Sequence, residues 1–489
     1  MLNVTELTGG YGSREVIRGV SFQVNKGEML GILGPNGSGK STLLKLISGI
    51  LPPSSGAVVL DGKNVADYTP RSLARQLAVL PQLHAHAFSH TVREMVALGR
   101  YPHQRGLFSS WSAEDEAAVR NAMHLLDVEK YEETLLEHLS GGEQQRAFVA
   151  QALAQDAPVM LLDEPTNHLD INHQKELLDT VKKQAIDREM TIVSIFHDIN
   201  LASMYCDRLL LLDQGRLVRF GQPHEVVQED VIREVYGTRV RSHPHSELPK
   251  PQITLLPEVK REEPEFRIRP GDLAVSAEGV AFQSRKPMKT VSSAVINAGA
   301  GWFRTFLNRR IPADYNCPDS EEEMKEYVIQ EGFRPTETVG MMTAVRTEGA
   351  VVREYTFAAG TLVIMVTAGI GTATDVSRAS VREIPAGTIN TWVLINGTLS
   401  EEAFIQAMIT ATEAKAKALA EEDVRDQLTG TVATGTPTDS LLIAATQQGT
   451  EIRYAGPVTE AGSTIGKGVF ECTVEAIRRY RAHRQDSDE

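Results

Sequence analysis

The sequence predicts an α/β protein with two domains, and three observations support this fold class. The chain has 489 residues, more than a single hydrophobic core usually serves. Up to about residue 240, β-branched runs such as "EMLGILG", "PVMLLDEP" and "TIVSIFHD" each precede a helix-like segment, as in a mostly parallel sheet with crossover helices. Six prolines then punctuate a charged stretch between Arg241 and Pro270, which is typical of a linker.

These observations predict where the domains begin and end. We expect a first domain over residues 1–242, a C-terminal extension and proline-rich linker over 243–269, and a second, mixed α/β domain over 270–489. Within the linker, "ITLL" is also compatible with a short edge strand. In the second domain, "TLVIMVTAG" predicts a buried strand, because its apolar part is far shorter than the ~20 residues that span a bilayer. A helix is predicted over 401–420, since Ser400 can cap it.

Composition limits the partners and the compartment. Subtracting 64 acidic from 50 basic side chains gives a net charge of -14, which argues against a nucleic-acid partner. Three widely spaced cysteines without a CxxC pair predict neither a disulfide framework nor a zinc site. No basic region followed by an apolar one opens the chain, so we expect no secretory signal and a cytoplasmic location.

The segment "GPNGSGKST" fits the P-loop template, follows a strand-like run and opens a helix-like one. Glycines let successive backbone N–H groups converge on phosphate oxygens at a helix N-terminus, while Lys40 adds a positive charge and Ser41 a magnesium ligand. We therefore predict ATP and Mg²⁺ as cofactors. The predicted ATP-binding residues of this loop are Gly34, Pro35, Asn36, Gly37, Ser38, Gly39, Lys40, Ser41 and Thr42.

Two carboxylates end the apolar run "VMLLDEP". Asp163 at a strand's end can hold magnesium, and the adjacent Glu164 can orient or deprotonate the attacking water. Alone, such a pair is usually a solvated strand end. The motifs that accompany it favour the catalytic interpretation.

Those motifs are "VLPQ", "LSGGEQQR", "NHLD" and the histidine after "TIVSIF", and in this order they resemble the ATP-binding cassette family. The resemblance covers the first half of the chain and implies a P-loop cassette with a helical subdomain. It implies that Tyr11 stacks on adenine and that Gln82 is a catalytic glutamine that also binds magnesium beside Ser41 and Asp163. It also assigns Glu164 as the catalytic base and His197 as the γ-phosphate switch.

The same resemblance implies a homodimer of cassettes. In the family, the "LSGGEQQR" segment of one copy closes on the ATP held by the P-loop of the other, and this chain carries one cassette only. ATP binding then drives closure, and hydrolysis resets it. The additional residues implied at the ATP site are Ser140, Gly141, Gly142 and Asp170.

The stretch after Gln82 resembles the importer cassettes for iron-siderophores, haem and vitamin B12, in which this region contacts a coupling helix of the membrane subunits. The resemblance implies integral membrane permease subunits and a substrate-binding protein as partners. It also implies a peripheral position on the inner face of the cell membrane.

Six segments of the second half, in order, resemble the adenosylcobinamide amidohydrolase family over residues 270–484. That family hydrolyses the amide joining the aminopropanol arm to the corrin ring, so the resemblance implies a corrinoid substrate. The six segments are "VSSAVINAGAG", "TAGIGTATD", "GTINTWVLING", "ATEAKAKAL", "ATGTPTDSLLIA" and "YAGPVTEAGSTIG".

The residues of this half leave few groups for amide hydrolysis. After His245 the next histidine is His483 in a charged tail, so a Ser/His/Asp arrangement is not expected, and Cys317 has no basic neighbour to activate it. Carboxylate bases and hydroxyl or backbone donors remain. The candidate bases are Asp375, Glu413 and Asp439, and the candidate donors are Thr436, Thr438 and Ser440.

Each candidate has a structural alternative. Asp439 can cap a helix that begins at "SLLIAATQQG", Glu413 can be a surface group, and Asp375 can close a turn. Asn297 and Asn390 are further candidates for amide recognition.

The leading hypothesis is an importer ATPase for corrinoids fused to a corrinoid amidohydrolase. The second hypothesis is a siderophore or haem importer ATPase whose C-terminal domain is a non-catalytic corrinoid-binding regulatory module. A soluble cassette ATPase acting on ribosomes or DNA is disfavoured, because such proteins usually carry two cassettes and a basic surface.

Overall fold

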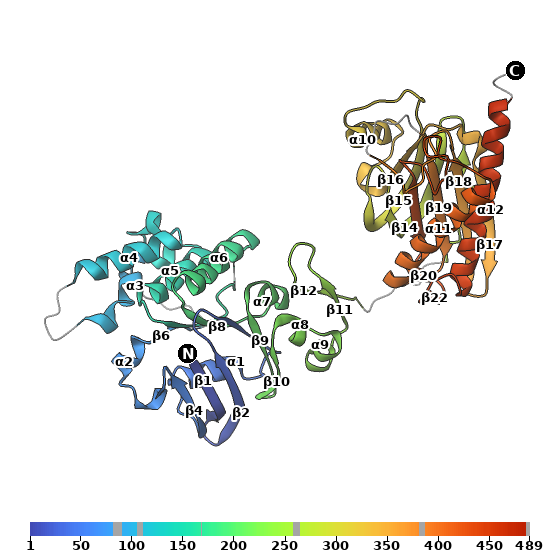
Figure 1. Cartoon of the computed structure of the whole chain (residues 1–489). Helices are drawn as coiled ribbons and strands as arrows, with labels where there is room; N and C mark the ends of the chain where they lie inside the picture. Colours follow the sequence, from blue (N-terminus) through green and yellow to red (C-terminus); the bar gives the residue numbers. More distant parts are fainter. Residues whose placement is uncertain (82–89, 105–110, 168, 258–264, 381–386, 486–489) are drawn as a thin grey trace. The chain divides into compact units, whose positions relative to one another are not determined.

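A computed structural model describes residues 1–81, 90–104, 111–167, 169–257, 265–380 and 387–485. The chain forms two compact units, Met1–Lys260 and Arg261–Glu489, which are described separately (Figure 1). Within the described ranges, no helix is long and apolar enough to cross a membrane.

The first unit alternates strands and helices, as the sequence predicts. Its strands are β1 (Leu2–Tyr11), β2 (Arg14–Val24), β3 (Met29–Leu33), β4 (Ser55–Leu60), β5 (Lys63–Asn64), β6 (Leu77–Leu80), β7 (Val159–Asp163), β8 (Thr191–Ile195), β9 (Arg208–Asp213), β10 (Arg216–Gly221), β11 (Val240–Pro244) and β12 (Pro251–Leu255). Its helices are α1 (Lys40–Ile47), α2 (Pro70–Ala74), α3 (Val92–Leu98), α4 (Ala113–Leu125), α5 (Gly141–Ala154), α6 (Ile171–Asp187), α7 (Ile199–Tyr205), α8 (Pro223–Val226) and α9 (Glu229–Tyr236).

Two sheets organise this unit. A six-stranded sheet has the order β10-β9-β3-β8-β7-β6 and is parallel except for β10, which confirms the predicted mostly parallel sheet. A four-stranded antiparallel sheet has the order β2-β1-β4-β5. Helices α3, α4 and α5 pack on one another and form the expected helical subdomain.

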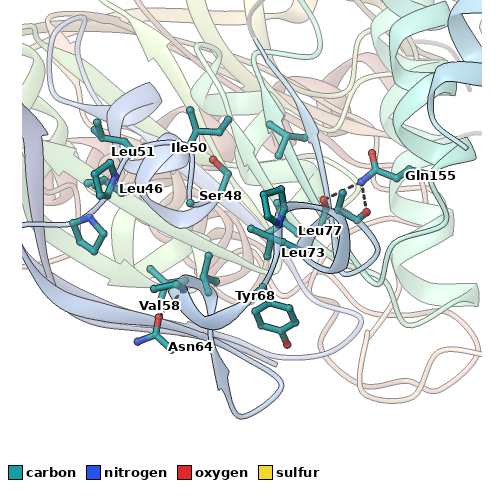
Figure 2. A pocket seen from close by; sticks show the side chains of 18 residues that line it. Leu46, Ser48, Ile50, Leu51, Val58, Asn64, Tyr68, Leu73, Leu77 and Gln155 are labelled. Atoms are coloured by element: carbon teal, nitrogen blue, oxygen red, sulfur yellow. Dashed lines mark hydrogen bonds between the residues drawn. The ribbon is translucent and has the colours of Figure 1, made fainter. Parts of the chain in front are cut away.

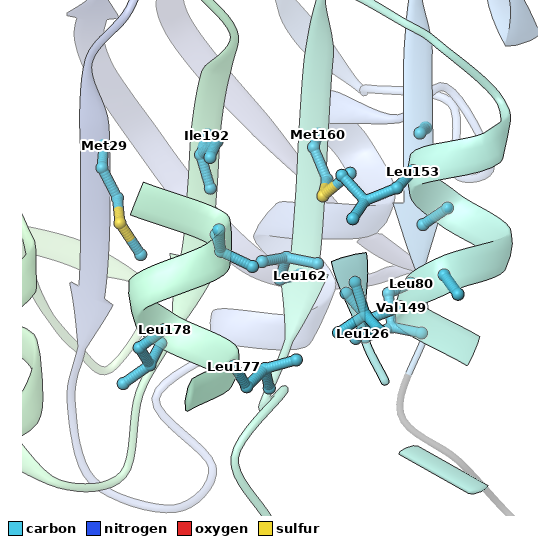
Figure 3. Packing of buried hydrophobic residues seen from close by; sticks show 14 of the residues in the cluster. Met29, Leu80, Leu126, Val149, Leu153, Met160, Leu162, Leu177, Leu178 and Ile192 are labelled. Atoms are coloured by element: carbon cyan, nitrogen blue, oxygen red, sulfur yellow. The ribbon is translucent and has the colours of Figure 1, made fainter. Parts of the chain in front are cut away.

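The central strands are buried on both faces, because helices cover one face and the antiparallel sheet with α1 covers the other. On the helical face, Met29, Met160 and Ile192 of neighbouring strands pack with Leu177 and Leu178 of α6 (Figure 3). The strands therefore form a rigid platform whose carboxyl ends carry the P-loop and the carboxylate pair.

A β-hairpin lies inside the segment predicted as a linker. Strands β11 and β12 pair antiparallel from Val240 to Leu255, so "ITLL" lies largely within a strand. Hydrogen bonds fasten β12 to α7: the Asn200 side chain bonds the backbone N–H and C=O of Ile253, and Ser203 Oγ donates to Pro251 O at 2.7 Å. The extension after residue 242 is therefore part of the first unit.

The second unit is a mixed α/β structure. Its strands are β13 (Ala274–Val275), β14 (Gly279–Ser292), β15 (Gly299–Arg310), β16 (Thr338–Thr343), β17 (Val351–Phe357), β18 (Gly360–Ala368), β19 (Ile389–Asn396), β20 (Thr398–Leu399), β21 (Ser440–Ala445) and β22 (Glu451–Ile452). Its helices are α10 (Ser320–Gln330), α11 (Glu401–Glu421) and α12 (Glu460–Gln485).

The main sheet of this unit has the order β16-β15-β14-β21-β19-β18-β17, with β13 paired to β14. Side chains of strands far apart in this order meet in one core, which shows that the sheet is strongly curled. Trp392 of β19 donates to Met341 Sδ of β16 at 3.3 Å, and Asn390 of β19 bonds Asn308 of β15. Helices α11 and α12 cover the opposite face.

Local predictions for this unit are partly confirmed. The predicted helix at 401–420 is α11, capped by Ser400, and "TLVIMVTAG" lies largely within the buried strand β18. The helix predicted from Ser440 is wrong, because "SLLIAA" forms β21, which pairs parallel with β19 in the buried sheet. Asp439 therefore does not cap a helix.

Candidate functional site

The P-loop connects β3 to α1 through a run of glycines. Gly34, Gly37 and Gly39 have φ values of 151, 81 and 103°, a region that side chains with a Cβ rarely adopt. A Cβ at Gly34 would also lie 2.2 Å from Leu212 O. The loop thus takes a conformation that only glycines tolerate, and it ends at the N-terminus of α1, where backbone N–H groups favour anions.

Lys40, the first residue of α1, is buried within this loop. Its Nζ donates to Gly34 O at 2.8 Å and to Pro35 O at 3.1 Å. Burial lowers the pKa of Lys40, while the nearby charges of Glu164 and Asp163 act in the opposite direction. The loop therefore holds an ammonium group close to two carboxylates without a direct ion pair.

Asp163 ends β7 next to the start of α1. Ser41 Oγ donates to Asp163 Oδ1 at 3.4 Å, and burial raises the pKa of Asp163. A hydroxyl and a carboxylate this close supply the oxygen ligands that Mg²⁺ prefers. The residues present at this position fit the predicted metal.

Glu164 has partners on both carboxylate oxygens. Its φ of 54° lies in the left-handed region, which is uncommon for a residue with a side chain. His197 Nε2 lies 2.5 Å from Glu164 Oε1, and Asn167 Nδ2 donates to Glu164 Oε2. The structure thus joins the predicted base and the predicted switch histidine, and it adds Asn167, to which the sequence analysis assigned no role.

The other predicted ATP-site residues lie in different settings. Tyr11 ends β1 and is 50% exposed, and Lys45 Nζ donates to its hydroxyl at 3.2 Å, the main cause of a lowered Tyr11 pKa. Asp170 caps α6 through the N–H of His173 at 2.9 Å. Gln82 lies outside the described residues.

Ser140 caps α5 in a capping box with Glu143. Glu143 Oε2 accepts from the Ser140 N–H and hydroxyl, both at 2.8 Å, and hydrogen bonds from Tyr131 and Ser140 lower the pKa of Glu143 to about 2. Ser140 and Gly141 are exposed, and within the described residues no hydrogen bond joins them to the P-loop. This helix end faces outward, free to meet another molecule.

An apolar groove of about 540 Å³ lies beside the C-terminal end of α1 (Figure 2). Leu46, Leu51, Leu73 and Leu77 contribute to its lining, and Ile50 at its margin is 66% exposed. The groove therefore presents apolar surface to solvent.

In the second unit, a pocket of about 710 Å³ lies between α11 and two loops, 374–380 and 434–439. Glu413, Lys415 and Asp439 line it. A smaller pocket of about 160 Å³ shares Thr412, Lys415 and Asp439 with it, so the Lys415–Asp439 pair lines both pockets. Of the predicted bases, Glu413 and Asp439 thus meet in one place.

Asp439 makes hydrogen bonds with both carboxylate oxygens. Oδ1 accepts from the Ile389 N–H at 2.8 Å and from the Thr436 hydroxyl, and Oδ2 accepts from the Thr436 N–H at 3.0 Å and from Lys415 Nζ. A carboxylate has about four acceptor sites, and all four are taken here. The geometry favours a positioning role for Asp439 over that of a base.

Lys415 was not among the predicted residues. Its side chain is 16% exposed, pairs with Asp439 and contacts both pockets. "ATEAKAKAL" contains two lysines at a spacing of two, and nothing local in it distinguishes Lys415 from Lys417. Glu413 is exposed on the same helix and makes no ion pair within the described residues.

Asp375 lies close by but outside the pocket lining. Its Oδ1 accepts from the Ser377 N–H and hydroxyl, and its Oδ2 accepts from the Thr431 hydroxyl at 2.6 Å. These hydrogen bonds, that of Thr431 foremost, lower the pKa of Asp375. Asp375 ties two loops together, in agreement with the turn alternative.

The remaining polar candidates make hydrogen bonds within the second unit. Asn390 is fully buried, donating to Asn308 Oδ1 and Met342 O, and Asn297 donates to Pro335 O and Thr338 O. Thr438 bonds Thr388 and Gly387 O, and Ser440 donates to Ser293 O. Cys317 donates to Asp319 O. Of the predicted donors, Thr436 alone lines the larger pocket, and neither asparagine does.

The fold and the site of the first unit define a P-loop nucleoside triphosphatase. The ABC transporter family matches residues 17–167, and the adenosylcobinamide amidohydrolase family matches residues 267–485. YvrA of Bacillus subtilis, described as an uncharacterized ABC transporter ATP-binding protein, is 39% identical over 479 residues, which cover 97% of this chain and 99% of YvrA. This protein therefore belongs to the family of ABC importer ATP-binding proteins, here fused to an adenosylcobinamide amidohydrolase-like domain.

Two further relatives each match about half of the chain. The petrobactin import ATP-binding protein FpuC of Bacillus anthracis is 42% identical over 253 residues, covering 51% of this chain and 91% of FpuC. The cobalamin import ATP-binding protein BtuD of Halobacterium salinarum is 38% identical over 239 residues, covering 49% of this chain and 59% of BtuD.

Proposed function

We propose that this protein is the ATP-hydrolysing subunit of a corrinoid importer, and that its second unit hydrolyses the aminopropanol amide of adenosylcobinamide to adenosylcobyric acid. A relative named for cobalamin import supports the first half of this proposal, and the amidohydrolase match supports the second. Uptake and remodelling of one class of compound would then reside on one polypeptide.

In the cassette, the residues take the following roles. The P-loop and Lys40 bind the phosphates, Tyr11 stacks on the adenine, and Glu164, held by His197 and Asn167, accepts a proton from the attacking water. Ser41 and Asp163 would hold Mg²⁺, with Gln82 as a further ligand, and the ion would supply charge neutralisation at the phosphates. The exposed helix end at Ser140–Gly142, together with Asp170, completes the site on a second copy in a homodimer.

The apolar groove of Figure 2 is the surface for the permease. Leu77 and Val79 of β6 line it, and Gln82 follows this strand after one further residue, Pro81. A permease helix seated there would act directly on the segment that leads to the magnesium site. We infer that the chain also works with a substrate-binding protein and lies at the inner face of the cell membrane.

For the second unit, the observation that carries the proposal is the Lys415–Asp439 pair, which lines both pockets. Lys415, held by Asp439, donates to the amide carbonyl oxygen and stabilises the negative charge that develops on it. Glu413 takes a proton from water as the new C–O bond forms, and the proton passes to the amine as the C–N bond breaks. The products are a carboxylic acid and aminopropanol, and Asp439 is a positioning residue.

The test uses the full chain with adenosylcobinamide and reads the product mass. The Lys415→Met variant should lose at least about 100-fold in turnover, the typical contribution of a charge-stabilising donor. Lys417→Met, two residues along the same helix and outside the pockets, is the matched control and should retain wild-type turnover. Equal turnover in the two variants would contradict the role of Lys415.

The alternative is a siderophore importer ATPase with a non-catalytic corrinoid-binding module. The relative named for petrobactin import favours it on the cassette side. On the side of the second unit, the full set of hydrogen bonds on Asp439 removes one candidate base. Tight binding of adenosylcobinamide without any product would establish this alternative.

A further inference from the structure

The second unit contains a separate pocket of about 210 Å³ that shares no lining residue with the pockets around Lys415. Arg310, Arg346 and Arg484 line it together with His483 and Tyr480, and among the described residues no aspartate or glutamate lines it. Three arginines, each with part of its side chain exposed to solvent, thus line one small pocket in a chain whose net charge is -14.

Segments far apart in the sequence build this pocket. Arg310 ends β15, Arg346 lies three residues after β16, and Arg484 lies in the last turn of α12. Thr367, near the end of β18, also lines it. The fold, and not a local run of basic residues, therefore brings the positive charges together.

Three other arginines of this unit each pair with a carboxylate. Arg309 pairs with Glu323 at 2.7 Å, and Arg481 and Arg478 pair with Glu422 at 2.9 and 2.8 Å. Within the described ranges, Arg310, Arg346 and Arg484 make no ion pair. Three like charges that repel one another, with no counter-ion among the residues that the structure describes, indicate a site for an anion.

Polar donors accompany the arginines. Thr367 Oγ1 accepts a hydrogen bond from Asn308 Nδ2 at 3.0 Å, which leaves its own hydrogen available to a ligand. Arg484 lies over the Tyr480 ring at 5.6 Å, which stiffens the guanidinium. Arg310 Nη1 donates to Ala277 O at 3.3 Å, which orients that side chain.

We propose that this pocket binds the phosphate group of a small phosphorylated ligand. Guanidinium forks match phosphate oxygens in a bidentate manner, and each such charge-assisted contact is strong. The volume of about 210 Å³ suits a phosphate ester rather than a ring system the size of a corrin. The site does not depend on amide hydrolysis by the same unit.

The pocket also has a physical route to its neighbour. Ala368 lines it, and Thr374, six residues later, lines the pocket that contains Lys415. Tyr480 Oη lies only 3.2 Å from where a Cβ on Gly371 would stand, so the loop between them packs against the anion pocket. Phosphate binding would therefore affect the conformation of the loop between Ala368 and Thr374.

The test is arginine footprinting of the full chain with phenylglyoxal, read peptide by peptide by mass spectrometry. Glycerol 2-phosphate should slow modification of Arg310, Arg346 and Arg484 at least about fivefold, and it should leave Arg478 unchanged. Residues 34–42 contain no arginine, so phosphate bound at the P-loop does not enter this readout.

Two further arms decide between outcomes. Acetate at equal concentration should protect weakly, and equal protection by acetate would overturn the assignment to phosphate. Arg346→Gln, at an exposed position, should weaken protection of the other two arginines about tenfold, whereas Arg478→Gln should not. Protection that is absent, or uniform over all arginines, would overturn the site.

Discussion

Each unit of the molecule holds a lysine with little solvent exposure close to an aspartate, and the two arrangements differ in what the lysine contacts. Lys40 donates hydrogen bonds to the backbone carbonyls of its own loop, and it interacts with Asp163 and Glu164 electrostatically, without hydrogen bonds to them. Lys415 pairs directly with Asp439, which also holds two backbone N–H groups. In the first unit the P-loop backbone positions the lysine. In the second unit a carboxylate that is distant in sequence positions it.

This difference has a chemical consequence. A lysine on neutral carbonyls keeps its full charge for a phosphate, whereas a lysine bound to a carboxylate is partly neutralised and acts as an oriented hydrogen-bond donor. The first arrangement suits a highly charged ligand, and the second suits a neutral amide.

The largest expected effect is on the first arrangement. Glu164→Gln should lower ATP hydrolysis about 100- to 10,000-fold, the usual contribution of a general base, while ATP binding persists. Steady-state phosphate release and equilibrium nucleotide binding measure the two quantities. Glu176→Gln, at an exposed position of α6, is the control, and full ATPase activity in Glu164→Gln would contradict the assigned base.

A buried ion pair that lines neither the apolar groove nor the pockets of the second unit sharpens the comparison. Arg100 and Asp115 are joined at 2.8 Å, with side chains 7% and 8% exposed. Asp115→Asn should destabilise the first unit by about 3 kcal/mol, because it leaves Arg100 buried without a counter-charge. Hydrogen exchange of first-unit peptides measures this loss, and ATP hydrolysis per folded molecule should not change.

Asp439→Asn should lower activity more than stability, the reverse of what we expect for Asp115→Asn. Loss of the charge that orients Lys415 should lower adenosylcobinamide turnover about 10- to 100-fold, with a smaller loss of stability, about 1–3 kcal/mol. Combining it with Lys415→Met tests whether the pair acts as a unit, in which case the double variant loses little more than Lys415→Met alone. Additive losses would separate the two roles.

The smallest expected effect is a pH dependence in the second unit. Burial raises the pKa of the Cys472 thiol to about 11, above its value in an unfolded chain. The folded state therefore holds this proton more tightly, so its contribution to stability is complete below about pH 9 and is lost towards pH 11. Between pH 8 and 11, the urea midpoint of unfolding should fall less steeply with pH in Cys472→Ala than in Cys317→Ser. Equal slopes in the two variants would contradict the role of the Cys472 thiol.

The same comparison explains what the sequence could predict. Lys40, Ser41 and the glycines lie within nine residues, and Asp163, Glu164 and His197 lie at or just after the end of an apolar strand, so local patterns identify them. Asn167 carried a weaker local signal, three residues after Glu164.

The second site lacked such patterns. Lys415 and Asp439 are 24 residues apart, and the strand that follows Asp439 resembles a short helix in composition. Whether the run folds as a strand depends on β19, which pairs with it across the sheet. Residues whose placement depends on such tertiary pairing remain hidden from a reading of local periodicity.

The hairpin that ends the first unit limits how the chain can be divided. Cleavage after residue 242 would cut through β11 and remove β12. Asn200, which lies three residues after His197, would then lose both of its hydrogen bonds to Ile253. The exposed edge of the severed strand would then be available to pair with another molecule. An isolated cassette that is to stay monodisperse should therefore extend past Leu255.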